Sequence, residues 1–485
     1  MLIFPENYFE REERSEYLVG ETIKRVWASQ IEILHEINKI CEKYNLRYFA
    51  FWGTLLGTIR HQGFIPWDDD LDIAMLGEDY ESFLEIANKE LPAGYELVNA
   101  YTSNRHDSHF TRIVNKHSVD VWGKESKEYH GCPFIMGIDI FPLYYVPREA
   151  QSAEEQKQIL RYIMQMDDII EYKNNHPDMA VEEKKEYELA IAQGLVDIQK
   201  MTGYQFVADR PLNSQLLMIF DQICRLFNAE ESDCVANFPR YVDKGWHLLD
   251  KKYFEEFIQL PFEDIMITVP KEYDAILKKL YGNYMVPKNT NKMNEHKALN
   301  SQAHALGEVL ERFYFQKCNG NQSIHINATD IAKTQLSHEE ISKTVSEEMA
   351  KKIFLSNAND KINRKKIILF YISVEKIILK SECVIEKIRK VLDEFEGQDD
   401  VLLWWLVSFD SYGTDTCLEK FIPNTLKKYR ELEKEIRDAK YCLYDDSGDI
   451  ARAIMLSDAY YGDEGLISTI YKASGKWMMI QNYEI

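Results

Sequence analysis

The stretch YFAFWGTLLGTIRHQGFIPWDDDLDIAM, residues 48–75, constrains the fold of this 485-residue chain more than any other. It begins with an aromatic, strand-like run, turns at Gly53-Thr54 into a short amphipathic segment, and ends in acidic and aliphatic residues that alternate. Successive side chains of a strand point to opposite faces. Asp70 and Asp72 are therefore expected on one face of a strand, with the aliphatic residues on the other.

Two carboxylates that share a face repel each other unless a cation lies between them. Mg²⁺, or Mn²⁺ in its place, prefers hard oxygen ligands, so the pair predicts a divalent metal site. The turn at Gly53-Thr54 predicts an anion site, because glycine and a helix N-terminus let backbone N–H groups approach a phosphate. An acidic run taken alone is more often a solvated turn or a surface strand. The two features together indicate one cleft for metal and phosphate.

The segment Gly53–Met75 resembles the LicD family, which has the nucleotidyltransferase fold and includes the fukutin-like enzymes. Members of that family are phosphotransferases that move a phospho-alcohol, such as phosphocholine or ribitol phosphate, from a CDP-linked donor to a glycan. The segment MGIDIFPL around Asp139 and the stretch 237–287 are similar to further parts of the LicD domain. The resemblance covers residues 23–287 and implies a transferase of phosphorus-containing groups.

The resemblance implies a role for each acid of these motifs. Asp139 becomes a third metal ligand beside Asp70 and Asp72. The alternative for Asp139 is a strand-end carboxylate bonded to backbone, because an unpaired acid is costly to bury in an apolar strand. Asp69 is the neighbouring candidate for the base that takes the proton of an acceptor hydroxyl.

The same motif implies the residues that hold the donor. Gly53 and Thr54 are expected to cradle its phosphate, with Arg60 and His61 on the next helical turn. Arg60 suits a bidentate phosphate contact, and a surface arginine at a helix end is an equal alternative. Aromatic faces should surround a quaternary ammonium if the head group is choline. The candidates for that contact, each of which also fits ordinary packing, are Trp52, Phe64 and Trp67.

The length of the chain predicts two or three domains and an α/β fold class. Residues 1–290 are expected to form an α+β nucleotidyltransferase-like domain, in which the charged, helix-periodic stretch 150–237 is a helical insertion. Residues 291–364 are polar and predict a linker with one helical segment. In residues 365–485, short apolar runs alternate with helix-length amphipathic stretches, which is typical of a doubly wound, Rossmann-like parallel sheet.

The last part of the chain offers a second candidate site. The segment YYGDEGLISTIYKASGK places the turn Gly462–Gly465 between a strand and a helix, where a phosphate or ribose docks in sheets of this kind. This turn is faintly similar to the nucleotide-binding half of CDP-glycerol glycerophosphotransferases, in which an acid followed by two serines occupies it. Here Glu464 and Gly465 stand in place of the serines. A second donor site and a partner-docking domain both stay open.

Composition narrows the partners and the compartment. The net charge of −22 argues against nucleic acid, because binding a phosphate backbone needs a basic face. The N-terminus becomes acidic within a few residues, and no apolar run approaches a membrane span, so a cytoplasmic protein without a transmembrane segment is expected. Peripheral contact with the inner membrane face stays open. Eight cysteines without a CxxC pair indicate reduced thiols.

Three interpretations of function follow from the sequence. The first is a CDP-choline-type phosphotransferase that acts on a cell-surface glycan or glycolipid precursor, as in lipopolysaccharide or teichoic acid modification. The second keeps the enzyme and changes the donor to CDP-ribitol or CDP-glycerol. The third is a non-catalytic, nucleotide-binding scaffold. The presence of Asp70, Asp72 and Asp139 together favours an enzyme.

Overall fold

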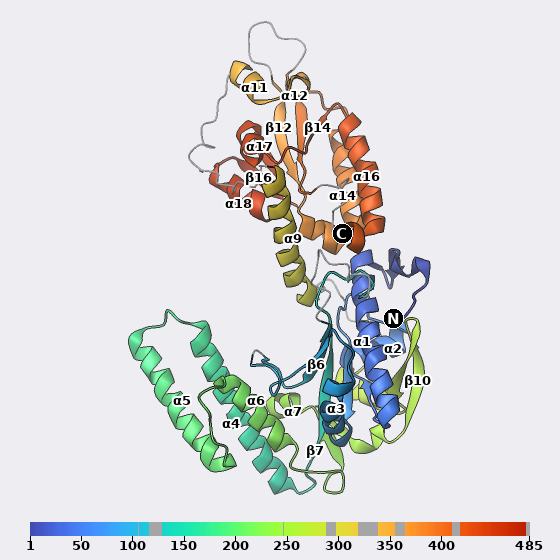
Figure 1. Ribbon diagram of the computed structural model, residues 1–485, viewed down its shortest axis with the longest axis vertical. Coiled ribbons are helices and arrows are strands. Elements are labelled where there is room, and N and C mark those ends of the chain that lie inside the picture. Colours follow the sequence, from blue (N-terminus) through green and yellow to red (C-terminus); the bar gives the residue numbers. More distant parts are fainter. Residues whose placement is uncertain are drawn as a thin grey trace. The chain divides into compact units, whose positions relative to one another are not determined.

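The computed structural model describes residues 1–104, 106–115, 129–245, 247–287, 297–318, 338–354, 364–409 and 418–481 (Figure 1). The chain forms two compact units. The first comprises Met1–Phe4, Trp27–Val119 and Ile135–Glu295, and the second comprises Pro5–Val26, Asp120–Phe134 and His296–Ile485. Each unit contains helices and a sheet with parallel strands, which confirms the predicted α/β class.

The first unit is built on a seven-stranded mixed sheet. Its main path runs β3 (Phe49–Ala50), β4 (Asp72–Leu76), β7 (Gly137–Val146), β6 (Thr111–Asn115) and β5 (Tyr95–Val98). Only β4 and β7 are parallel on this path. The second half of β7 pairs with β8 (Cys234–Ala236), which pairs with β9 (Leu248–Asp250).

Helices cover this sheet. The helix α1 (Glu21–Tyr44) has apolar residues at intervals of three and four, and those from Trp27 to Cys41 are buried. The helix α2 (Trp52–His61) follows β3, and α3 (Gly77–Glu90) follows β4. The strand-like run before Gly53 is shorter than expected, because α2 already begins at Trp52. That residue adopts a φ of +46°, a conformation that is uncommon outside glycine.

Residues 150–237, expected to be helical, contain three helices and the short strand β8. The helices are α4 (Ala150–Asn175), α5 (Val181–Thr202) and α6 (Leu212–Cys224), and α4 packs against both of the others (Figure 1). They form an arm beside the sheet. The helix α7 (Phe238–Lys244) leads from this arm back to β9.

The first unit ends in a hairpin and a helix. The hairpin consists of β10 (Phe257–Phe262) and β11 (Ile265–Pro270), preceded by the 3-10 turn η4 (Lys251–Phe254). The helix that follows the hairpin is α8 (Tyr273–Tyr281). This helix matters for the site below, because its last residue faces the acidic cluster.

The second unit contains a five-stranded sheet in the order β14 (Cys442–Asp445), β13 (Val401–Leu406), β12 (Lys366–Tyr371), β15 (Ala459–Gly462) and β16 (Trp477–Ile480). All of its strand pairs are parallel, which confirms the predicted doubly wound sheet. The strand order reverses between β12 and β15. The helices between these strands are α13 (Val374–Lys380), α14 (Glu382–Phe395), α15 (Leu418–Phe421), α16 (Pro423–Asp438), α17 (Ile450–Leu456) and α18 (Leu466–Ala473).

The second unit also includes segments that precede the sheet in sequence. The 3-10 turn η1 (Glu6–Phe9) and the hairpin of β1 (Glu12–Arg14) and β2 (Tyr17–Val19) belong to it, and Thr425 N donates to Glu21. The described part of the expected linker contains α9 (Lys297–Cys318), α11 (His338–Thr344) and α12 (Glu347–Ile353). The boundary expected at residues 290–291 and the remaining linker, 292–296, 319–337 and 355–363, lie outside the described residues.

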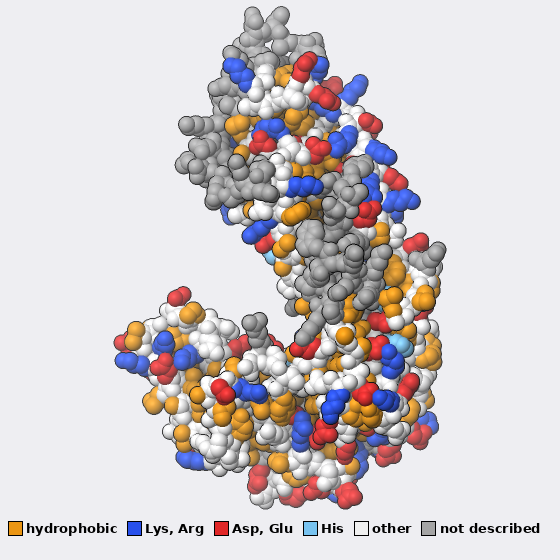
Figure 2. Space-filling model, in the orientation of Figure 1, with side chains coloured by type: hydrophobic (Ala, Val, Ile, Leu, Met, Phe, Trp, Pro, Cys, Tyr) orange, Lys and Arg blue, Asp and Glu red, His pale blue; other side chains and the backbone are white. Residues whose placement is uncertain are grey.

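The surface carries both signs of charge. On the face seen in Figure 2, Lys and Arg side chains are interspersed with Asp and Glu. Among the helices that the structure describes, none is long and apolar enough to cross a membrane.

Candidate active site

Three charged side chains form a row across the sheet of the first unit. Asp72 on β4 is the register partner of Asp139 on β7, and Asp139 is the partner of Arg112 on β6. Side chains at opposite positions of neighbouring strands share a face and lie close together. The Arg112 guanidinium donates from Nε to Asp139 Oδ1 at 2.5 Å and from Nη2 to Oδ2 at 2.9 Å. The fold therefore unites two predicted acids and adds an arginine that the sequence analysis missed.

Two further acids join this row from the segment before β4. Asp68 and Asp70 precede Asp72 at intervals of two residues, and the carboxyl groups of Asp68 and Asp70 share a hydrogen bond. Asp68 also lies close to the start of α2, since a Cβ at Gly53 would lie 2.9 Å from Asp68 Oδ2. Asp69, the predicted base, lies between these two acids in the sequence. It is buried, and its carbonyl oxygen accepts a hydrogen bond from Gln30.

The carboxylates of this cluster disfavour one another's charge. Burial raises the pKa of Asp68 to about 8, and the neighbouring Asp70 and Asp69 add to the shift. Burial, Asp70, Asp139 and Asp68 raise the pKa of Asp72 well above its usual value, and Arg112 offsets only part of this effect. Desolvation and, after it, the charge of Asp139 raise the pKa of Asp70, whereas its hydrogen bond with Asp68 and the charge of Arg112 act in the opposite direction. Crowded acids of this kind gain from a bound cation.

The donor set has the chemistry of a magnesium site, because it consists of carboxylate oxygens. Within the described residues, however, no three side chains of His, Cys, Asp or Glu stand arranged to hold a metal ion. Arg112 holds both oxygens of Asp139, and Asp68 and Asp70 bond to each other. The residues present fit a divalent cation by type and charge, and their side chains would turn toward it on binding.

The Gly53-Thr54 turn positions the acids. The hydroxyl of Thr54 accepts a hydrogen bond from Asp72 N at 2.7 Å, and the Thr54 carbonyl accepts one from Thr58. Thr54 is buried. In this structure the turn therefore fixes the start of β4 against α2, while Gly53 leaves room for Asp68 as described above.

The other predicted phosphate ligands lie two turns farther along α2. Arg60 donates from Nε to His61 Nε2 at 2.8 Å and from Nη1 to the carbonyl oxygen of Tyr284 at 3.0 Å. His61 also contacts the edge of Trp67, with ring centroids 6.0 Å apart. The structure thus groups Arg60, His61 and Trp67 with one another rather than with Asp139.

Tyr281, the last residue of α8, was not predicted and faces the acids. Burial raises the pKa of its phenol, and the charges of Asp72, Asp68 and Asp70 raise it further. Arg60 acts in the opposite direction on the same phenol. Tyr281 therefore lies near both the acidic cluster and Arg60, and its hydroxyl stays protonated.

Two of the head-group candidates pack against protein groups. Phe64 is only 2% exposed, stacks on Trp27 with ring centroids 4.8 Å apart, and also contacts Phe262, so it is a core residue. Trp52 stacks on the imidazole of His247 at 4.7 Å, and the guanidinium of Arg240 lies 5.5 Å from its ring centroid. A cation already occupies the surroundings of Trp52, which disfavours a second one there.

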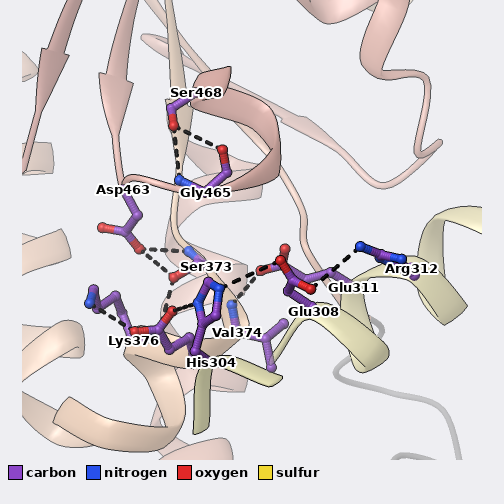
Figure 3. A network of polar contacts seen from close by, with 11 residues as sticks. His304, Glu308, Glu311, Arg312, Ser373, Val374, Lys376, Asp463, Gly465 and Ser468 are labelled. Carbon is purple, nitrogen blue, oxygen red and sulfur yellow. Dashed lines mark hydrogen bonds and ion pairs between the residues drawn. The ribbon is translucent and has the colours of Figure 1, made fainter. Parts of the chain in front are cut away.

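In the second unit, carboxylates of the chain itself occupy the place where a bound anion is expected. In a doubly wound sheet, ligands bind where the strand order reverses, at the carboxyl ends of the strands. There Ser373 N donates to Asp463 Oδ2 at 2.6 Å, and Val374 N donates to Glu311 Oε1 at 2.8 Å (Figure 3). Glu311 comes from α9. Two carboxylates of the chain therefore take the first N–H groups of α13, beside the turn that ends at Gly465.

Comparison with known proteins identifies the region that holds the acidic cluster. Residues 45–166 match the family described as LicD/FKTN/FKRP, nucleotidyltransferase domain. The chain carries a LicD-family domain. It is 26% identical over 265 residues to the lipopolysaccharide cholinephosphotransferase LicD of Haemophilus influenzae, an alignment that covers 53% of this chain and 88% of that protein.

Two shorter similarities involve uncharacterized proteins. Those of Rickettsia typhi and Rickettsia prowazekii are each 39% identical over 69 residues, which covers 14% of this chain and 22% or 26% of the relative. The matched LicD domain contains Asp68, Asp70, Asp72, Asp139 and Arg112. Tyr281 lies beyond residue 166 and reaches the site through α8.

Proposed function

We propose that the LicD domain transfers a phospho-alcohol, most specifically phosphocholine, from a CDP-linked donor to a glycan or glycolipid precursor. The observation that carries this proposal is the acidic cluster of Asp68, Asp70, Asp72 and Asp139, which includes the parallel β4–β7 pair. The similarity to a lipopolysaccharide cholinephosphotransferase supports the phosphocholine donor. The family match supports the wider class of reaction.

Asp70, Asp72 and Asp139 are the residues that would hold Mg²⁺ or Mn²⁺. A bound divalent ion supplies neutralisation of the charge that develops on a transferring phosphoryl group and on its leaving group. The mutual repulsion of these acids supports the assignment, because a cation relieves it. The positive charge that faces Asp139 in this structure is the guanidinium of Arg112.

Arg112 also suits direct contact with the donor phosphate. Its guanidinium has five N–H donors, and the two groups that point at Asp139 leave Nη1 for another acceptor. The side chain is 44% exposed, so a ligand can reach it. Planar, bidentate donors of this kind recognise phosphate well.

Asp68 takes the place that the sequence analysis gave to Asp69. A general base works best when its pKa lies near the working pH, and the pKa of Asp68 is raised to about 8. Its Oδ2 lies beside the start of α2 at Gly53. In the proposed reaction this carboxylate accepts the proton of the acceptor hydroxyl.

The test measures CMP release from CDP-choline by the purified full chain with Mg²⁺, next to CDP-ribitol and CDP-glycerol. We expect CDP-choline to be cleaved fastest and Asp72→Asn to lose the activity while its circular dichroism is retained. Faster cleavage of a polyol donor would move the assignment to the second interpretation. Cleavage that is unchanged in Asp72→Asn would place the activity elsewhere or favour the scaffold.

A further inference from the structure

Basic side chains gather where the helical arm of the first unit leads back to the sheet. The helix α7 packs against α4 and carries Arg240 and Lys244, which are four residues apart and share a face of the helix (Figure 1). Lys157 of α4 lies at the end of α7, because its Nζ would be 3.8 Å from a Cβ at Gly245. Lys157, Arg240 and Lys244 are called the basic patch below.

Aromatic rings, rather than carboxylates, lie against two cations of the basic patch. The Arg240 guanidinium is 5.5 Å from the ring centroid of Trp52, and Lys157 Nζ is 4.8 Å from that of Tyr241. Within the described part of the chain, neither Arg240 nor Lys157 makes an ion pair or a side-chain hydrogen bond. Arg240 is also exposed. Its N–H donors are therefore available to a ligand.

The local charge has the opposite sign to that of the whole chain, which has 80 acidic and 58 basic residues. The acids beside the basic patch are Asp243, which lies 3.8 Å from Lys244, and Glu154, one turn before Lys157 on α4. Arg161, which bonds to the backbone of α7, adds a further positive charge. A local excess of positive charge attracts anions.

Trp52 connects the basic patch to the acidic cluster. It directly precedes Gly53, at which a Cβ would lie 2.9 Å from Asp68 Oδ2. Its ring also contacts Phe141, with centroids 5.8 Å apart, and Phe141 follows Asp139 by two residues on β7. The ring that meets Arg240 therefore borders the acids of the proposed active site.

The sheet separates this side of the site from the donor side. Arg112, which suits the donor phosphate, lies on β6, whereas Trp52 follows β3. The β4–β7 pair lies between these two strands. An acceptor whose hydroxyl meets Asp68 can therefore extend across Trp52 to Arg240, while the donor lies toward Arg112.

We infer that the basic patch binds a phosphate group of the acceptor, so that the acceptor is a phosphate-bearing, anionic glycan. The inference rests on the proposed function and adds the chemical class of its second substrate. A phosphate monoester carries up to two negative charges and three acceptor oxygens, which matches three cations from two helices better than a singly charged carboxylate does.

An anionic bilayer is the other phosphate-bearing partner that a group of cations can meet. A bilayer is extended, so it would also approach the acids of a chain with a net charge of −22 and be repelled by them. One phosphate on a glycan meets the basic patch alone. The local charge thus favours the glycan.

The test measures binding of pentamannose 6-phosphate to the purified full chain by calorimetry with Mg²⁺, next to the same pentamannose without its phosphate. We expect the phosphate to tighten binding roughly tenfold or more at low salt, and less at high salt. Arg240→Gln should raise the Kd of the phosphorylated probe roughly fivefold to thirtyfold, and Arg240→Lys, which keeps the charge, should raise it less. Lys157→Gln is the second variant if Arg240→Gln does not fold.

The matched control is Lys184→Gln, which removes an exposed cation of α5 and should leave the Kd unchanged. Equal binding of the two pentamannoses, or an effect of Arg240→Gln no larger than that of the control, would overturn the inference and leave the transferase in place. Displacement of the probe by CDP-choline would also overturn it, because the basic patch would then hold the donor diphosphate.

Two further outcomes separate the remaining possibilities. If Arg240→Gln abolishes binding to phosphatidylglycerol vesicles while the chain shows no preference for the phosphorylated probe, the basic patch meets a membrane and the inference is wrong. A chain that binds the phosphorylated probe through Arg240 and cleaves no CDP-linked donor would contradict the proposed function and support the phosphate site.

Discussion

Both units gather acids against the ends of strands, but they surround them differently. In the first unit, Asp72 meets other carboxylates, and their charges raise its pKa further after burial. In the second unit, Asp463 accepts the backbone N–H and the hydroxyl of Ser373, and Glu311 accepts Val374 N. Carboxylates that accept hydrogen bonds from backbone N–H groups stabilise the start of a helix. Carboxylates that lie close to one another repel, and a bound cation reduces this repulsion.

The largest expected effect is at Asp72. Replacement by asparagine removes one charge from the repelling cluster and one ligand from the proposed metal site. Electrostatic stabilisation of a transition state by one group is worth about 10²–10³ in rate, so cleavage of CDP-choline should fall by at least that factor. Without metal, the thermal midpoint of Asp72→Asn should equal or exceed that of the wild type, because repulsion is relieved.

The matched variant in the second unit is Asp463→Ala. It leaves Ser373 N, a buried donor, without its acceptor, which costs about 1–3 kcal/mol of stability. Cleavage of the donor should be unchanged at a temperature where both proteins are folded. If Asp72→Asn lowers the thermal midpoint as Asp463→Ala does, the contrast between the two acidic groups fails.

Arg112 should show the next largest effect. In Arg112→Gln, Asp139 loses a bidentate partner, and a metal no longer competes with a guanidinium for its two oxygens. We expect roughly tenfold to hundredfold slower turnover, in the range of a lost charge-assisted contact, together with tighter Mg²⁺ binding. Titration of Mg²⁺ in single-turnover cleavage measures both quantities. Weaker Mg²⁺ binding in this variant would show that Arg112 supports the metal ligands instead of competing with them.

The sequence predicted those parts of the fold that depend on local pattern. The inner parallel strands of the second unit, β12 and β13, are largely buried and therefore read as continuous apolar runs. Asp72 lies in a strand as expected, whereas Asp70 precedes that strand, which begins at Asp72. The start of α2 at Trp52 was missed, because a positive φ at a tryptophan has no sequence signal.

The remaining site residues depend on pairing over long distances. Arg112 joins Asp139 only because β6 and β7 are neighbours in one register, and Tyr281 arrives from a helix that follows the inserted arm. Phe64, a head-group candidate that also fitted ordinary packing, fills the core between Trp27 and Phe262. Spacing along the chain carries none of this information.

Glu311 gives a pH-dependent test of the second unit. Burial raises its pKa to about 7, with added effects of Asp463 and Glu375, while Val374 N and the Tyr371 hydroxyl act in the opposite direction. The folded protein therefore binds this proton more tightly than the unfolded chain does. Stability should fall by about 3 kcal/mol as the pH rises from 4.5 to 7, and then level off.

The measurement for Glu311 is the difference between wild type and Glu311→Gln across this pH range. The glutamine keeps an oxygen for Val374 N and has no proton to lose, so the variant should gain on the wild type as the pH rises. Chemical denaturation at each pH gives the two stabilities. A difference that stays constant between pH 4.5 and 8 would show that the folded state does not shift the pKa of this acid.

The smallest expected effect belongs to Tyr281. Tyr281→Phe keeps the ring that packs in α8 and removes only the hydroxyl that faces Asp72, Asp68 and Asp70. A neutral hydrogen bond is worth about 0.5–1.5 kcal/mol, so turnover should fall roughly twofold to tenfold with the thermal midpoint nearly unchanged. A loss as large as that of Asp72→Asn would mean that Tyr281 contacts the reacting groups themselves.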